Sequence, residues 1–95
     1  NKLAIELMLL IVDRLVKETN ELLTENESSV TISITDACRE KLAKDGYQPS
    51  MGARPLKRVF EDKVKKPLSK KILFESISDT NIVVDIQNDE YTFVI

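Results

Sequence analysis

Apolar residues recur at three- and four-residue intervals over residues 2–25, which predicts a long amphipathic helix. Its first turns are apolar almost all round, through the run Leu7 to Val12. An isolated chain would expose that surplus, so we expect a neighbouring domain to cover it and the chain to be an excised piece of a longer protein. The predicted inward stripe comprises Leu7, Met8, Ile11, Leu15, Leu22 and Leu23.

Two stretches alternate apolar and polar residues, the pattern of half-buried strands. The first follows a break at residues 26–29, and its inward residues are Val30, Ile32 and Ile34. The second predicts a C-terminal hairpin with its turn near Asn88-Asp89. Ile82, Val84 and Ile86 alternate with Val83, Asp85 and Gln87 on one strand, and Tyr91, Phe93 and Ile95 continue on the next.

Two further helices are predicted between these strands. Thr35 can cap a short helix over residues 36–45, and Gly46 lies where a left-handed helix terminator is expected. Its sparse inward residues are Ala37, Leu42 and Ala43. A longer helix over residues 55–75 contains Pro67, which should kink it or divide it in two. Its apolar stripe comprises Leu56, Val59, Phe60, Val64, Leu68, Ile72 and Leu73.

These elements together predict an α+β fold in which three principal helices pack on one face of a small three-stranded sheet. Ninety-five residues are enough for a single domain, so residues 1–95 are assigned to one unit. The apolar fraction is 42% and the charged fraction 32%, as in ordinary globular chains. The net charge of −2 gives no field that favours nucleic acid or an anionic membrane.

The composition excludes several kinds of catalytic or metal site. The chain has no histidine and a single cysteine, so it cannot build a Ser–His or Cys–His nucleophile, a histidine zinc site or an internal disulfide. Cys38 is expected to be a small buried residue, and the composition fits a reducing cytosol. No segment approaches the ~20 apolar residues of a membrane-spanning helix. We therefore predict no catalytic residue, no metal ligand, no nucleic-acid or membrane partner, and a cytoplasmic location.

Two charged stretches are interpreted as solvated surface. A lysine-rich stretch runs from Lys57 to Lys71, but acidic residues interrupt it and no aromatic side chains for base stacking are interleaved with it, since Phe60 and Phe74 are assigned to the apolar side. The carboxylates of the first helix, among them Glu21 and Glu25, are spread over several turns rather than convergent.

The candidate functional site is the turn-forming run from Gly46 to Leu56, which contains both glycines of the chain. It delivers Arg54 to the start of the long helix, where Pro55 suits the first helical position. A fixed cation beside a row of free amide donors and the positive end of a helix dipole is suited to meeting phosphate. The residues alone leave open that Arg54 is an ordinary surface arginine.

The chain contains no phosphate-cradling glycine-rich loop and no apolar strand ending in acidic residues for Mg²⁺ and water activation. It therefore lacks the machinery that binds and cleaves ATP, and Arg54 would be one donor contributed to a site built elsewhere.

An ordered series of short motifs resembles the carboxy-terminal small domain of Clp-family AAA+ ATPases. The motifs are Gly46-Tyr47, Pro49, Gly52-Ala53-Arg54-Pro55, Lys65-Lys66-Pro67-Leu68 and Leu73-Phe74. The resemblance covers roughly residues 11–87. The methionine before Gly-Ala-Arg-Pro and the Lys-Lys-Pro-Leu motif look more like the protease-coupled, ClpA-like A-type members than the B-type disaggregases. The segment from Leu23 to Ser29 is a few residues longer than the family usually has.

The resemblance implies a lid domain of an ATP-dependent protein unfoldase. Arg54 would be the sensor-2 arginine that reaches nucleotide held by a large domain, with Gly52 and Ala53 letting the backbone come close. ATP, and Mg²⁺ with it, would be bound mainly by that missing domain. The implied partners are the large domains of the same and the neighbouring subunit in a homo-hexamer, a ClpP-like peptidase, and unfolded or tagged protein substrates. The parent protein would be an ATPase, whereas this chain alone would not be catalytic.

A second hypothesis is a free-standing binding or adaptor module that docks a partner through its exposed apolar helix start. The sequence upstream of residue 1 would discriminate the two, because only the first requires a P-loop there.

Overall fold

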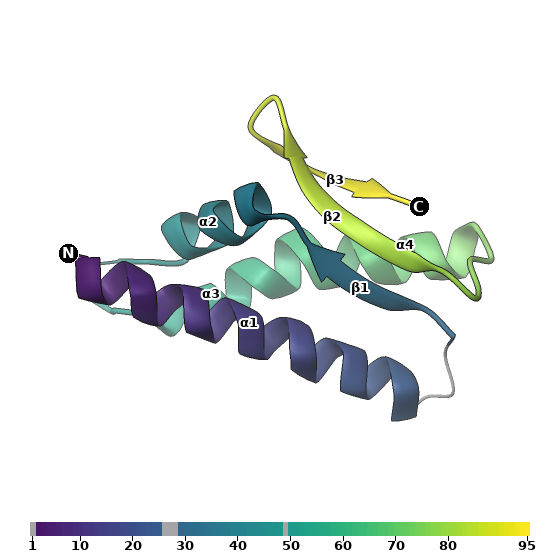
Figure 1. Ribbon diagram of the computed structural model, residues 1–95, viewed down its shortest axis with the longest axis horizontal. Helices are drawn as coiled ribbons and strands as arrows, with labels where there is room; N and C mark the ends of the chain where they lie inside the picture. Colours follow the sequence, from purple (N-terminus) through teal and green to yellow (C-terminus); the bar gives the residue numbers. More distant parts are fainter. Residues whose placement is uncertain (1, 26–28, 49) are drawn as a thin grey trace.

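The structure, a computed structural model, describes residues 2–25, 29–48 and 50–95 (Figure 1). Sequence expectations for the break at residues 26–28 and for Pro49 lie outside these described residues. The elements in chain order are α1 (Lys2–Glu25), β1 (Thr31–Ile34), α2 (Asp36–Asp45), α3 (Arg54–Phe60), the π-helical turn η1 (Glu61–Lys65), α4 (Lys66–Phe74), β2 (Asn81–Gln87) and β3 (Glu90–Val94).

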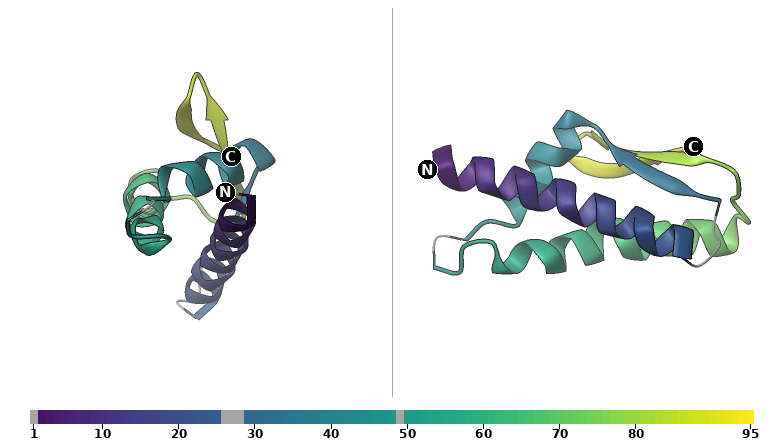
Figure 2. Two further views of the ribbon diagram at one scale, coloured as in Figure 1. Left: turned by 90° about the vertical axis from the view of Figure 1, so that its left-hand side faces the viewer. Right: turned by 60° about the horizontal axis from the view of Figure 1, so that its bottom comes forward.

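The three strands form one sheet in the order β1-β2-β3. β1 lies parallel to β2, and β2 and β3 form an antiparallel hairpin that pairs Gln87 with Glu90. Asn88 and Asp89 close the hairpin with φ values of 52° and 64°, the left-handed backbone that a tight two-residue turn requires. α3, η1 and α4 follow one another without a gap over residues 54–74 and are called the α3–α4 rod. α1 and this rod lie on one side of the sheet, as Figure 2 shows in its right-hand view. The α+β architecture predicted from the sequence is confirmed.

The buried stripe of α1 differs from the predicted one. It comprises Met8, Val12, Leu15 and Thr19, whereas Leu7 and Leu22 are exposed. Thr19 can lie in the stripe because its hydroxyl donates to the Leu15 carbonyl oxygen at 2.8 Å. The prediction was wrong at those two leucines because the spacing of apolar residues does not by itself reveal which of them the core covers.

Pro67 divides the second long helix, as predicted. The Lys66 N–H donates to the carbonyl of Glu61, five residues back, so the chain makes one wide turn before α4 begins. This turn removes the conflict between the Pro67 ring and a regular α-helical ladder. Leu56, Phe60, Val64 and Leu68 still form one continuous buried stripe across it.

The end of α4 departs from the predicted stripe. Leu73 and Phe74 are 73% and 77% exposed, although both were assigned to the apolar side. Val59 and Ile72 are partly buried and pack against the core.

The short helix α2 packs through Cys38, Leu42 and Ala43, while Ala37, predicted to face inward, is exposed. Thr35 caps it as predicted, its hydroxyl oxygen accepting the Cys38 N–H at 3.2 Å. Burial raises the pKa of the Cys38 thiol to about 12, so the thiolate required of a nucleophile is not populated at neutral pH.

Candidate functional site

The loop between α2 and α3 is closed by its own backbone. Gln48 and Gly52 form an isolated antiparallel bridge, in which the Gln48 N–H donates to the Gly52 carbonyl at 3.2 Å. The Gly52 N–H donates to the Gln48 carbonyl at 2.6 Å. Two half-buried side chains, Tyr47 and Ala53, pack against the core on either side of this bridge. The loop is therefore anchored at both ends, and the start of α3 is held in a fixed place.

Gly46 does not terminate α2 in the left-handed conformation that the sequence predicted. Its φ of −90° and ψ of 0° are open to any residue. The constraint is instead the space around it, because a Cβ at this position would lie 2.6–2.8 Å from side-chain and backbone atoms of Leu56. Gly46 thus lets α2 and α3 approach closely, and that contact positions the start of α3.

Replacing Gly46 by alanine should therefore destabilise the chain by about 1–3 kcal/mol, the usual cost of forcing atoms into a packed interior. If space were available, alanine at this backbone conformation would instead stabilise the fold by about 0.4–1 kcal/mol. Urea denaturation gives the sign directly. Gly52→Ala is the matched control, since a Cβ there meets nothing within 4 Å and costs only the strain of its φ of +62°. A stabilised Gly46→Ala variant would contradict the close approach.

Arg54 is the first residue of α3 and is exposed. Within the described part of the chain its guanidinium has no hydrogen bond and no ion pair, while its backbone N–H donates to the Met51 carbonyl at 3.3 Å. Gly52, Ala53 and Arg54 are consecutive and lie together at this corner, as the sequence predicted. The corner presents a positive charge whose donors are directed to solvent.

The expected row of free amide donors at this helix start is not present. The Arg54 and Leu56 N–H groups donate to the Met51 and Ala53 carbonyls, and Pro55 has no N–H. The loop itself therefore takes the donors that the sequence pattern appeared to leave open. An anion at this corner would be bound through the Arg54 side chain rather than through the backbone.

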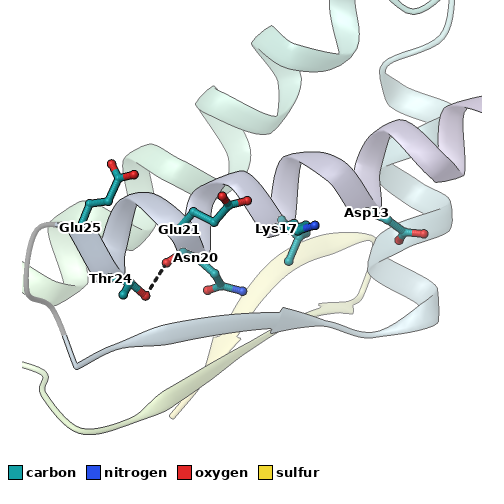
Figure 3. A pocket seen from close by; sticks show the side chains of 7 residues that line it. Asp13, Lys17, Asn20, Glu21, Thr24 and Glu25 are labelled. Atoms are coloured by element: carbon teal, nitrogen blue, oxygen red, sulfur yellow. Dashed lines mark hydrogen bonds between the residues drawn. The ribbon is translucent and has the colours of Figure 1, made fainter.

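A shallow depression lined by residues of α1 is a second candidate site, and sequence reasoning did not identify it (Figure 3). Asn20 points toward β1, where its amide nitrogen donates to the Ile32 carbonyl at 3.0 Å and its amide oxygen accepts the Ile32 N–H at 2.8 Å. Thr24 donates to the Asn20 carbonyl at 3.0 Å, and Asp13 pairs with both donors of the Arg39 fork. These polar groups satisfy one another and protect the edge of β1, a structural role.

The described residues offer neither a metal site nor a membrane-spanning helix. Among residues 2–25, 29–48 and 50–95, no group of three or more cysteine, aspartate or glutamate side chains lies close enough together to hold a metal ion. No helix in this part of the chain is long and apolar enough to cross a membrane. Several lysines of the basic stretch pair with carboxylates one helical turn away, for example Lys66 with Asp62 at 3.2 Å, which favours the solvated-surface interpretation.

A mixed three-stranded sheet backed by helices on one side, with an exposed arginine at the start of α3, defines a small α+β domain. Residues 3–86 match the family described as the C-terminal, D2-small domain, of ClpB protein. The chain belongs to this family.

Curated relatives agree with the family match. Chaperone protein ClpB of a Bacillus cereus strain is 37% identical over 81 residues, which are 84% of this chain and 9% of that protein. Chaperone protein ClpB of Aquifex aeolicus is 36% identical over 85 residues, 88% of this chain and 8% of that protein. The Brucella suis protein of the same name is 41% identical over 73 residues, 77% of this chain and 8% of that protein. The chain thus spans less than a tenth of the length of these relatives.

Proposed function

We propose that this chain is the lid domain of an ATP-dependent protein unfoldase and that Arg54 is its sensor-2 arginine. In this proposal Arg54 reaches nucleotide held by a large domain outside this sequence. ATP hydrolysis there would then be coupled to motion of the lid in a ring of subunits, and a cytoplasmic location would fit such a machine.

The observation that carries the proposal is that the Arg54 side chain is exposed and has no partner among the described residues. A guanidinium that is exposed and engages none of the described residues keeps all its N–H donors for a ligand, and its planar fork fits phosphate oxygens. The loop that holds it is anchored by the contact of Gly46 with Leu56 and by the bridge of Gln48 with Gly52. The backbone that carries the charge is therefore already in place, and only the Arg54 side chain has to be ordered when it meets developing charge.

The described residues include a side chain that can bind the phosphates of ATP but no set of ligands for Mg²⁺. Arg54 suits the phosphates, whereas no cluster of oxygen ligands for Mg²⁺ is found in the described part of the chain. Mg²⁺ would therefore be held elsewhere, and this chain would contribute one side chain to a shared site.

This sharing predicts that the isolated chain does not bind ATP with micromolar affinity. One arginine supplies about 1.5–3 kcal/mol of charge-assisted contact, against the ~8 kcal/mol that micromolar binding requires. Isothermal titration of the 95-residue chain with Mg·ATP tests this. A dissociation constant in the micromolar range would show that the site is complete in this chain and would overturn the proposal.

The relatives bear on the type of Clp protein. All those we report carry the name ClpB, and they give no support to the A-type likeness expected from the methionine and the Lys-Lys-Pro-Leu motif. We therefore propose a chaperone-type unfoldase acting on unfolded or aggregated protein. Coupling to a ClpP-like peptidase is the alternative, and a degradation assay of a tagged substrate with and without such a peptidase separates the two.

The adaptor hypothesis rests on a specific feature, the exposed apolar start of α1. Leu7 and Leu10 are 57% and 62% exposed, so the start of α1 presents apolar surface that this chain does not cover. In the lid proposal this patch packs against a large domain, of the same or a neighbouring subunit. In the adaptor hypothesis it docks an unrelated protein, and Arg54 has no role.

A further inference from the structure

Residues of the C-terminal half of α1 and of η1 and α4 line a groove. In the right-hand view of Figure 2, α4 lies on the side of α1 away from β1. Its volume is about 440 Å³. Apolar side chains from both helices line it, namely Leu22, Leu23, Leu68 and Ile72. Leu22 is 49% exposed, so the α1 wall presents apolar surface that the fold itself does not cover.

The apolar surface continues beyond the groove along α4. Ser69 and Lys70 line the groove, and Leu73 and Phe74 lie one helical turn further along α4, just beyond the residues that line it. Both side chains are largely exposed. Single exposed leucines are ordinary on a protein surface, but several exposed apolar side chains on two helices beside an apolar groove are typical of an interaction site.

The rim of this groove is basic, although the whole chain has a net charge of −2. Lys65, Lys66 and Lys70 line it together with a single carboxylate, Glu61. Lys65 pairs with Glu61 at 3.6 Å and Lys66 pairs with Asp62 at 3.2 Å. Lys70 has no ion pair within the described residues, so its charge is available to a partner.

We propose that this groove docks an amphipathic helix of a partner protein, with leucine-type side chains along one face and glutamate or aspartate beside them. Two helical walls around an apolar floor are the form that receives the apolar face of a third helix. The lysines on the α4 rim would meet the acidic flank and fix the orientation of the bound helix. A flat membrane surface would reach the rim but not the floor between α1 and α4. The proposal is independent of the role of Arg54.

The direct test uses a labelled synthetic helix with leucine at positions i, i+3, i+4 and i+7 and glutamate on both flanks. Fluorescence anisotropy with the 95-residue chain should give saturable binding with a dissociation constant on the order of tens of micromolar. A matched peptide with lysine in place of each glutamate should bind at least about fivefold more weakly, and added salt should reduce the difference.

Variants of exposed residues locate the site without disturbing the core. Leu22→Gln and Leu73→Gln should each weaken binding of the acidic peptide at least about fivefold, because each removes apolar contact area. Lys70→Glu should weaken the acidic peptide and strengthen the lysine peptide. Ile95→Gln is the control, since Ile95 is an exposed apolar residue outside this groove, and it should leave both affinities unchanged. Circular dichroism melts verify that all four variants fold.

Several results would overturn the proposal. One is the absence of saturable binding at millimolar peptide. Another is binding that Leu22→Gln and Leu73→Gln leave unchanged. Binding to anionic lipid vesicles without binding to the peptide would indicate a membrane surface instead. Self-association in sedimentation velocity that Leu22→Gln abolishes would show that a second copy of the chain is the occupant.

Discussion

Replacing Arg54 by alanine in the full-length protein is expected to lower ATP hydrolysis and protein unfolding together, each by at least about tenfold. Removing one preorganised donor to developing charge typically costs about 10²–10³ in turnover, and an arginine that also links nucleotide to the lid should affect both activities. Steady-state ATPase and unfolding of a fluorescent tagged substrate measure the two effects. Nucleotide binding should weaken less than turnover, because in the proposed arrangement a phosphate loop in the large domain would remain.

The same substitution in the 95-residue chain should leave the free energy of unfolding within about 0.5 kcal/mol of the wild type, as for surface positions generally. Arg54 is exposed, and its side chain contacts no described hydrogen-bond or ion-pair partner. A full-length Arg54→Ala protein with wild-type ATPase and unfolding rates would refute the sensor assignment. A melting temperature lowered as far as by a core substitution would instead make Arg54 structural.

Arg54→Lys refines the comparison. Lysine keeps the positive charge but loses the planar fork and its several fixed donors, so it should restore activity only in part. Full activity with lysine would mean that charge alone matters at this corner. Activity as low as that of alanine would mean that the bidentate geometry carries the effect.

The sequence predicted the fold well where local signals agreed with one another. The hairpin turn at Asn88-Asp89, the Thr35 cap and the division of the helix at Pro67 each follow from local backbone chemistry. The failures lie at Leu7, Leu22, Leu73 and Phe74, where apolar residues exceed what the core of this chain can bury. Periodicity shows that a helix is amphipathic, but tertiary packing decides which of two apolar faces is covered.

The candidate site was predicted in position but not in detail. The order Gly52-Ala53-Arg54-Pro55 was sufficient to place an exposed arginine at a helix start. The use of the amide donors by the loop, and the contact of Gly46 with Leu56, depend on how α2 and α3 approach each other, which no local pattern encodes. Asn20 was missed for the same reason, because its two hydrogen bonds to Ile32 join residues 12 apart. The position of Asn20, a polar residue directly after Thr19 at the end of the buried stripe of α1, is a weak signal that could have indicated its role.

The two phenylalanines of the α3–α4 rod provide the sharpest test of how the rod packs. Phe60 is 1% exposed and lies within the core with Leu56 and Val64, whereas Phe74 at the far end of the rod is 77% exposed. The sequence pattern assigned both to the same apolar side. Phe60→Ala should therefore cost about 3–5 kcal/mol, from lost burial and the cavity left behind.

A loss of that size is most of the stability of a small domain, so Phe60→Ala is expected to be largely unfolded at 37 °C or to lose roughly 15 °C or more in melting temperature. Phe74→Ala deletes the same kind of side chain at a solvent-exposed position. It should change the free energy of unfolding by less than about 0.5 kcal/mol. Urea denaturation followed by circular dichroism compares the two variants under one condition. Equal losses would show that α4 buries its last turn and that Phe74 is not available to a partner. A large loss for Phe60 with none for Phe74 would show that Phe74 does not stabilise the fold of this chain, as its exposure implies.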